Sequence, residues 1–213
     1  MTNNTEAVVL IHGLFMNGWD MSLLRSRISD GGFYTHQFSY HSTSTNIDQI
    51  TSELHKLTES IQADKIHYVG HSLGGLVIRH FLESYPSTPK GRVVTLGSPH
   101  NGSNVAHFLN CYDFTSKILG ESLNTGLLGN APPWSGSREL GSIAGNVGFG
   151  MGFIFPDLKE PNDGTVSVEE TELENMTEHI QVPTSHTGLL LSKIVADHAL
   201  NFLKQGKFAD NNQ

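Results

Sequence analysis

The chain has 213 residues and a formal net charge of −8, from 13 basic and 21 acidic side chains. This length suffices for one well-buried core but is short for two, so we expect a single domain over residues 1–213. No run of Lys or Arg forms a basic stripe, which argues against nucleic acid as a partner. The one cysteine, Cys111, has no partner for an internal disulfide, and we expect it to be a small buried side chain.

The N-terminal segment MTNNTEAVVLIHG reaches an apolar strand within a few positions of Met1. It leaves no room for the charged region, apolar core and cleavage site of a secretory leader, so we expect a cytoplasmic protein. A chain trimmed of its leader would read the same. No apolar stretch approaches the ~20 residues of a membrane helix, and integral membrane association is not expected.

Short apolar runs bounded by Gly, Ser or Asp alternate with segments of helical period. This alternation is typical of an α/β fold with a six-stranded, mainly parallel sheet and helices on both faces. The expected strands cover residues 7–11, 34–40, 66–70, 92–97, 140–145 and 179–182.

Two helices in this pattern have no evident chemistry. Apolar residues recur at three- and four-residue steps from Ile47 to Ile61, and Asn46 is the expected N-cap. The last helix is expected over residues 189–203, with a polar continuation that frays. Its expected buried residues are Leu190, Ile194, Ala196, Leu200 and Leu203.

Residues 101–138 and 146–162 break the alternation after the fourth and fifth strands. Both lie beyond the carboxyl ends of strands, where ligands bind in open α/β sheets. The apolar segments 108–128 and 148–158 would line an acyl pocket or form a short lid, and ordinary loop packing explains them equally well.

The segment IHYVGHSLGGLVIRHFLESY reads as a strand, a tight turn and an amphipathic helix, with Ser72 at the centre of a G-x-S-x-G turn. Such a turn strains the serine backbone, and its glycines let strand and helix approach each other. The following helix presents free N–H groups to a developing oxyanion. An inert serine in a tight turn is the alternative, but the position between strand and helix favours a nucleophile.

This turn is typical of the α/β-hydrolase fold, whose oxyanion hole takes two backbone amides. One belongs to the residue after the nucleophile, here Leu73. The other comes from the loop after an earlier strand, for which VVLIHGLFMNGWDM offers Leu14 as first choice and Phe15 as second. His12 in that segment is expected to be structural.

The same fold places an acid and then a histidine after the serine in chain order. His186 is the expected base because it lies in the turn PTSHTG between the last strand and the last helix, whereas His179 opens a strand and His198 lies in mid-helix. Asp163 in PNDGTV is the expected acid, with Asp157 in reserve. An Asp-Gly turn in which the aspartate only caps the backbone is the alternative for Asp163.

Together the motifs resemble those of small lipase-like α/β-hydrolases, especially compact bacterial lipases and related esterases. The resemblance runs from about Val8 to Phe202 and rests on HGLFMNGWDM, GHSLGG, TLGSPHNGS, NDGTV and SHTGLL, in that order. That family more often has Thr where this chain has Ser98, a difference that leaves the catalytic assignments untouched.

The resemblance implies a minimal serine hydrolase that cleaves a small-molecule carboxylic ester or lipid through an acyl-enzyme, without a cofactor. Ser72 would be the nucleophile, His186 the base and Asp163 the acid that orients it. We expect a short or medium acyl chain.

Three alternatives stay open. The same triad would serve a thioesterase or an amidase, and the fold would also serve a noncatalytic module that binds a lipid or a protein partner. A catalytic metal is not expected, because the histidines show no spacing such as H-E-x-x-H. A structural calcium ion, the oligomeric state and the natural substrate are left undetermined.

Overall fold

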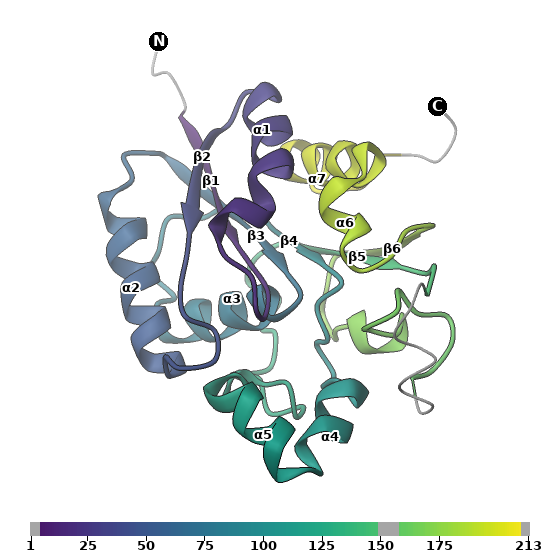
Figure 1. Ribbon diagram of the computed structural model, residues 1–213. Coiled ribbons are helices and arrows are strands. Elements are labelled where there is room, and N and C mark those ends of the chain that lie inside the picture. Colours follow the sequence, from purple (N-terminus) through teal and green to yellow (C-terminus); the bar gives the residue numbers. More distant parts are fainter. Residues whose placement is uncertain (1–4, 149–157, 210–213) are drawn as a thin grey trace.

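A computed structural model describes residues 5–148 and 158–209. Its centre is a six-stranded sheet in the order β2-β1-β3-β4-β5-β6, with every neighbouring pair parallel (Figure 1). The strands are β1 (Glu6–Ile11), β2 (Tyr34–Phe38), β3 (Lys65–His71), β4 (Val93–Leu96), β5 (Leu140–Gly145) and β6 (Glu178–Val182). Each expected strand is present, and the predicted α/β class is confirmed.

Helices cover both faces of the sheet, as predicted. One face packs against α1 (Ser22–Asp30), α6 (Gly188–Leu191) and α7 (Lys193–Gln205). The other packs against α2 (Ile47–Ser60) and α3 (Leu73–Ser84). The cap predicted for α2 is also present, because the Asn46 side chain accepts a hydrogen bond from the amide of Gln49.

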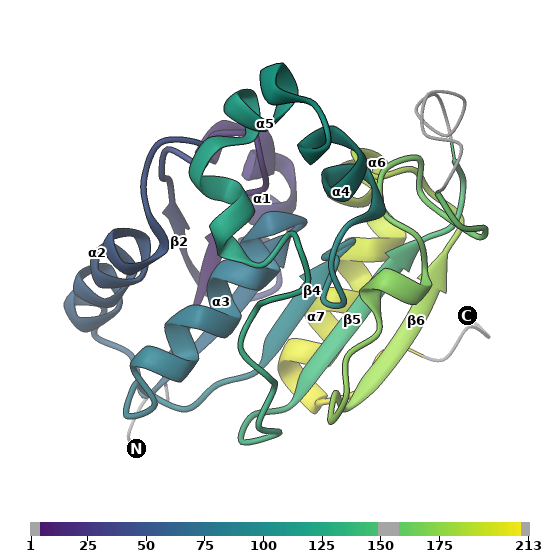
Figure 2. The ribbon, with the colours of Figure 1, turned by 90° about the horizontal axis from the view of Figure 1, so that it is seen from below.

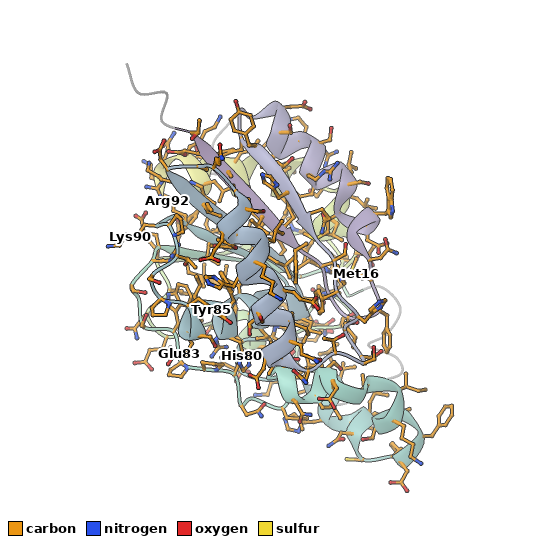
Figure 3. The ribbon with its side chains drawn as sticks, turned by 90° about the vertical axis from the view of Figure 1, so that its left-hand side faces the viewer. Met16, His80, Glu83, Tyr85, Lys90 and Arg92 are labelled. Atoms are coloured by element: carbon orange, nitrogen blue, oxygen red, sulfur yellow. The ribbon has the colours of Figure 1, made fainter. Side chains whose placement is uncertain are left out.

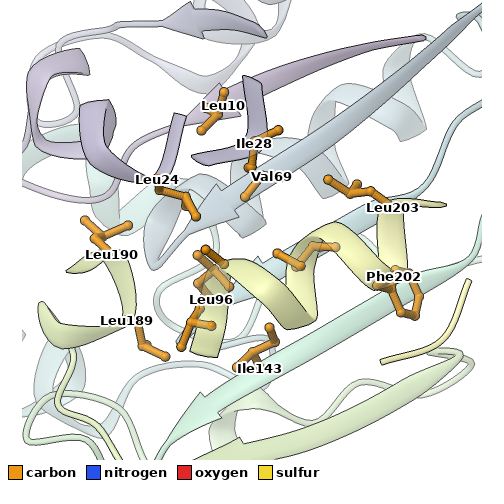
Figure 4. Close-up of a cluster of buried hydrophobic side chains, with 14 of the residues drawn as sticks. Leu10, Leu24, Ile28, Val69, Leu96, Ile143, Leu189, Leu190, Phe202 and Leu203 are labelled. Carbon is orange, nitrogen blue, oxygen red and sulfur yellow. The ribbon is translucent and has the colours of Figure 1, made fainter. Parts of the chain in front are cut away.

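The strand β1 contributes to both cores. Val8 and Leu10 point into the core under α1 and α7, and Val9 and Ile11 point into the core under α2 and α3, since successive side chains of a strand face opposite sides. All four are completely buried. A strand covered on both faces therefore reads as a continuous apolar run. Figure 4 shows the first core around Leu10, with side chains from α1, α6 and α7.

The last predicted helix was wrong in its continuity. Ser192 has extended backbone, φ −70° and ψ 129°, so α6 ends before it and α7 begins after it, with the Ser192 side chain accepting from the amide of Val195. The break resets the helical phase, and Ile194 is 56% exposed instead of buried. The predicted fraying after residue 203 is also wrong as far as residue 209, because α7 continues to Gln205 and Phe208 packs on Phe202.

The first of the two segments that interrupt the alternation, the excursion over residues 101–138, contains α4 (Asn104–Asn110), α5 (Asp113–Leu119) and the 3-10 helix η2 (Gly120–Thr125). Figures 1 and 2 place α4 and α5 together at one end of the molecule. Cys111 between them is exposed, so the expectation that it is buried was wrong. Of the second excursion, residues 149–157 lie outside the described residues, and with them most of the apolar segment 148–158 and the reserve acid Asp157.

Because all strands run parallel, their carboxyl ends lie together at one edge of the sheet. Figure 3 shows Met16, which follows the carboxyl end of β1, on the opposite side from Lys90 and Arg92, which precede β4. The loops after β1, β3, β4, β5 and β6 therefore meet at one sheet edge. Over residues 5–148 and 158–209, no helix combines the length and the apolar character that a bilayer crossing requires.

Candidate active site

Ser72 occupies a one-residue turn, the elbow, between β3 and α3, the elbow helix. Its backbone has φ 53° and ψ −122°, a region that residues other than glycine rarely adopt. The Ser72 amide donates to the carbonyl oxygen of Leu96 at the end of β4, over 2.9 Å. The turn is thereby fixed at the carboxyl edge of the sheet.

The glycines that flank Ser72 are required by space. A Cβ atom on Gly70 would lie 2.6 Å from the amide nitrogen of Gly75, and one on Gly74 would collide with the carbonyl oxygen of Ile11. Both neighbours are backbone atoms and have no freedom to move aside. The G-x-S-x-G pattern therefore brings α3 directly against β1 and β3.

Asp163 and His186 are hydrogen-bonded to each other. The distance from His186 Nδ1 to Asp163 Oδ2 is 2.7 Å. Asp163 is 1% exposed, whereas the His186 side chain keeps 15% of its surface exposed. The pair places an imidazole, backed by a buried carboxylate, at the edge where the loops after β5 and β6 meet.

The second carboxylate oxygen of Asp163 is held by backbone. Asp163 Oδ1 accepts from the amides of Thr165 at 2.9 Å and Val166 at 2.8 Å. These contacts are the Asp-Gly turn considered as an alternative role for Asp163. The structure shows that the two roles are compatible, because each carboxylate oxygen serves one of them.

The backbone amides of Leu14 and Leu73, expected to form the oxyanion hole, differ from the Phe15 amide in their hydrogen bonding. The Phe15 amide donates to the Ser42 hydroxyl over 3.2 Å. In the described part of the chain, the amides of Leu14 and Leu73 have no hydrogen-bond partner. Leu73 opens α3, where the first amides of a helix are free by geometry. The first choice for the loop donor, Leu14, therefore fits better than Phe15.

The Ser72 hydroxyl makes no hydrogen bond with the His186 ring in the described residues, although the two segments are in contact. The rings of His71 and His186 lie 4.7 Å apart between centroids, and His71 directly precedes Ser72. Catalytic hydrogen bonds are often long in enzymes without substrate and shorten when it binds. The structure thus joins Asp163 to His186 directly and links Ser72 to them through its neighbour.

Three residues of this region were missed by the sequence analysis. His71 is the variable position of G-x-S-x-G, and Gly97 at the end of β4 lies beneath the Asp163–His186 pair. Glu170 is 6% exposed and accepts from the amides of Asn104 at 2.6 Å and Ser167 at 2.7 Å. Burial raises the Glu170 pKa. The acidic surroundings of Glu170 in the sequence, VEETELE, gave no signal that one member was buried.

His12 and Ser98, two further residues of the sequence motifs, are buried in the fold. His12 is completely buried, and its Nε2 accepts from the amide of Tyr40 over 3.2 Å, in keeping with the structural role expected for it. Ser98 is also buried, and a Cβ atom on Gly75 would collide with its hydroxyl. The side chain at position 98, where the family more often has Thr, therefore packs against α3.

Among the described residues, no cluster of three or more His, Cys, Asp or Glu side chains is arranged to hold a metal ion.

The fold is shared with solved lipases and esterases. The lipase BlEst2 of Bacillus licheniformis in its propeptide form superposes with a TM-score of 0.76 at 18% identity, over 99% of this chain and 53% of that chain. A metagenomic carboxyl esterase gives 0.67 at 16% identity, over 87% and 65%. Polyneuridine aldehyde esterase gives 0.62 at 14% identity, over 94% and 100%. The chain thus spans about half the length of the BlEst2 structure.

These likenesses establish the α/β-hydrolase fold and bear out the resemblance to lipases and esterases. No curated protein sequence matches the chain. The palmitoyl protein thioesterase family matches residues 7–130, more than half of the chain, including the first strand loop and the elbow. The chain therefore belongs to the palmitoyl protein thioesterase family.

Proposed function

We propose that this protein is a serine hydrolase that cleaves carboxylic esters, with Ser72, His186 and Asp163 as its catalytic triad. The observation that carries the proposal is the 2.7 Å hydrogen bond between His186 and the buried Asp163, at the sheet edge where Ser72 holds a strained turn. Since β3 supplies the serine and the loops after β5 and β6 supply the acid and base, we also propose that the chain works as a single catalytic domain.

The reaction begins with the Ser72 hydroxyl. Its oxygen attacks the ester carbonyl carbon while its proton passes to Nε2 of His186. The imidazolium is stabilised by the carboxylate of Asp163, which also holds the proton of Nδ1 in place. The carbon–alkoxy bond then breaks, and the departing alcohol takes the proton from His186, which leaves an acyl-enzyme. Water, deprotonated by the same histidine, releases the acid and restores Ser72.

The negative charge that develops on the carbonyl oxygen needs fixed donors. The amides of Leu14 and Leu73 are free in the described residues and belong to the two segments that flank Ser72. The Cβ atom that glycine lacks at position 13 would lie 3.0 Å from Ser72 Cβ, so the loop of Leu14 runs close to the serine. Such preorganised donors supply much of the stabilisation in acyl transfer.

For the substrate, we propose a small-molecule ester with a short or medium acyl chain. Phe15, beside Leu14, is 63% exposed and has φ 57°, so strained backbone holds an apolar side chain at the surface next to the proposed oxyanion donor. Rates on p-nitrophenyl esters from acetate to palmitate measure this preference. Comparable rates across the whole series would contradict it.

A thioesterase is the second candidate, and the family match favours it. The same serine would attack an acyl thioester, with a thiol leaving in place of an alcohol. Matched butyryl and octanoyl substrates, each as oxygen ester, thioester and amide, separate the candidates. A kcat/KM that is highest for the thioester at both chain lengths would replace the ester proposal.

The deciding experiment exposes wild type and Ser72→Ala to a serine-reactive phosphonate and records intact mass and ester hydrolysis. Wild type is expected to gain one adduct and turn over, while Ser72→Ala does neither. The control is Ser84→Ala, which changes an exposed serine at the end of the same helix and is expected to behave as wild type. A folded wild type that is neither labelled nor active would overturn the proposal in favour of a noncatalytic binding module.

A further inference from the structure

His71 contacts three parts of the candidate site. It ends β3 and is bonded to Ser72, and its ring is 1% exposed. Its Nε2 atom lies 3.1 Å from the carbonyl oxygen of His186, and the two rings are 4.7 Å apart. A Cβ atom on Gly13 would lie 3.2 Å from His71 Nδ1, so the ring also borders the loop that carries Leu14.

The hydrogen bond fixes the protonation of His71. A carbonyl oxygen only accepts, so Nε2 carries the proton and Nδ1 carries a lone pair. Nδ1 is buried without a hydrogen-bond partner among the described residues. A second proton there would be desolvated, and the positive charge would be repelled by a charge on His186, so the pKa of His71 is lowered to about 3. His71 is therefore a neutral donor that adds no charge beside an imidazole that must itself accept a proton.

The contacts of Asp163 do not fix the position of His186 relative to Ser72. They hold the ring and the amide of His186 against the acid loop, at 2.7 Å and 2.9 Å, but they do not reach the elbow. Among the described residues, the bond from His71 is the one hydrogen bond that joins residues 183–187 to residues 65–84. It comes from the residue directly before the nucleophile.

We propose that His71 is a positioning residue that sets the His186 ring relative to the Ser72 oxygen. The inference rests on the proposed function, in which His186 takes the proton of Ser72. Asp163 fixes the orientation of the His186 ring, and His71 fixes the position of that ring relative to Ser72. Displacements of about 1 Å between reacting groups cost on the order of 100-fold in rate, so one misplaced hydrogen bond at this point has a large effect.

The test compares His71→Phe, which keeps a ring without a donor, with His71→Gln, whose amide nitrogen can reach the position of Nε2. Rates are expressed per active site titrated with the phosphonate. His71→Phe is expected to lower kcat about 10- to 100-fold with little change in KM, and His71→Gln to recover most of that loss. If the Phe variant does not fold, His71→Asn replaces it, because its shorter amide does not span the distance.

The matched control is His67→Phe. His67 lies in the same strand and is completely buried, but it is four residues from His71, about 13 Å along the strand. Its Nδ1 accepts from the amide of Arg92, at the other end of the sheet. This variant is expected to lower the free energy of unfolding while kcat per titrated site stays at the wild-type value.

The NMR signal of the His186 Nδ1 proton distinguishes misplacement from loss of the base. This proton is shifted downfield by its short bond to Asp163, and it is expected to persist in His71→Phe. Persistence with a reduced kcat supports positioning by His71. Wild-type kcat per titrated site in His71→Phe, or no recovery by His71→Gln, overturns the inference while the triad proposal stands. Absence of labelling and turnover in wild type overturns the triad itself.

Discussion

Asp163 holds His186 twice, once through its carboxylate and once through its main chain. The ring nitrogen Nδ1 lies 2.7 Å from Oδ2, and the amide of His186 donates to the Asp163 carbonyl oxygen over 2.9 Å. The acid therefore positions the backbone of the histidine turn as well as the tautomer of its ring. Removing the charge and removing the support are separable changes.

The variant Asp163→Asn removes the charge and keeps the main-chain bond. We expect kcat/KM for a p-nitrophenyl ester to fall about 10³- to 10⁴-fold, because the amide neither stabilises the imidazolium nor selects the tautomer with its proton on Nδ1. The control is Asp197→Asn, which breaks an exposed ion pair with Lys193 on α7 and is expected to leave the rate unchanged. A loss below 10-fold in Asp163→Asn would remove Asp163 from the triad.

Gly97 makes room for the same pair. A Cβ atom there would lie 3.0 Å from Asp163 Oδ2 and 3.1 Å from His186 Nδ1. We expect Gly97→Ala to push the carboxylate and the ring apart and to lower kcat/KM more than 10-fold. Since Gly97 has φ +57°, the variant also adds backbone strain of about 1 kcal/mol.

The strain has its own control in Gly32→Ala. Gly32 has φ +99°, and a Cβ atom there would meet nothing within 4 Å. Urea unfolding is expected to show a loss of stability from backbone strain in both variants, larger in Gly97→Ala because its methyl group also lies 2.8 Å from Leu189 Cδ1, whereas only Gly97→Ala loses activity. Equal activities of the two variants would mean that the Asp163–His186 pair tolerates the added methyl group.

The sheet and its order of elements could be predicted because the strands are buried on both faces and end in turn residues. The Asp163–His186 contact was predictable for a related reason. Parallel strands deliver the loops after β5 and β6 to one edge, and chain order then selects the acid and the histidine. These inferences need only periodicity and connectivity, and both are local properties of the sequence.

The missed features are ones that hydrophobic periodicity and residue type do not determine. Ser192 ends one helix and caps the next, but its sequence neighbours continue an apolar pattern that reads as one helix. His71 acquires its partner 115 residues away, and no spacing rule predicts that a histidine beside Ser72 will donate to the His186 main chain. Cys111 was expected to be buried from its residue type alone, and its position between two short helices at the molecular edge exposes it.

Arg79 is a buried cation that binds carbonyl groups. Its guanidinium on α3 donates to the carbonyl oxygens of Pro132, His100 and Ala131, and among the described residues it has no carboxylate partner. Burial lowers its pKa to about 10, so it stays charged at neutral pH. Arg79 thus holds the excursion of residues 101–138 against the elbow helix.

We expect Arg79→Met to lower the free energy of unfolding by about 3 kcal/mol, because several buried carbonyl oxygens lose their donors at once. Arg79→Lys is expected to lose less, since an ammonium group reaches fewer of them. Urea unfolding measures both. The control is Arg25→Met, which changes an exposed arginine on α1. Equal stabilities of Arg79→Met and Arg25→Met would show that the carbonyl groups are satisfied without Arg79.

Buried histidines should make the fold sensitive to acid. Burial lowers the pKa of His67 to about 4 and those of His71 and His100 to about 3. In the unfolded chain histidine titrates near pH 6.5. Below that pH the unfolded state binds protons that the folded state refuses, so stability falls as the pH falls, down to the folded pKa values. Each such histidine contributes a slope of about 1.4 kcal/mol per pH unit.

Urea unfolding at pH 7, 6, 5 and 4.5 tests this expectation. These three histidines alone contribute a fall in the free energy of unfolding of about 4 kcal/mol per pH unit once the pH is well below 6.5. His67→Gln should reduce the slope by about 1.4 kcal/mol per pH unit, because one titrating group is removed. His41→Gln, at an exposed position, should leave it unchanged. Equal slopes in wild type and His67→Gln would mean that His67 is protonated in the folded state, where its Nε2 lies 3.3 Å from Glu6 Oε2 and a charged pair would form.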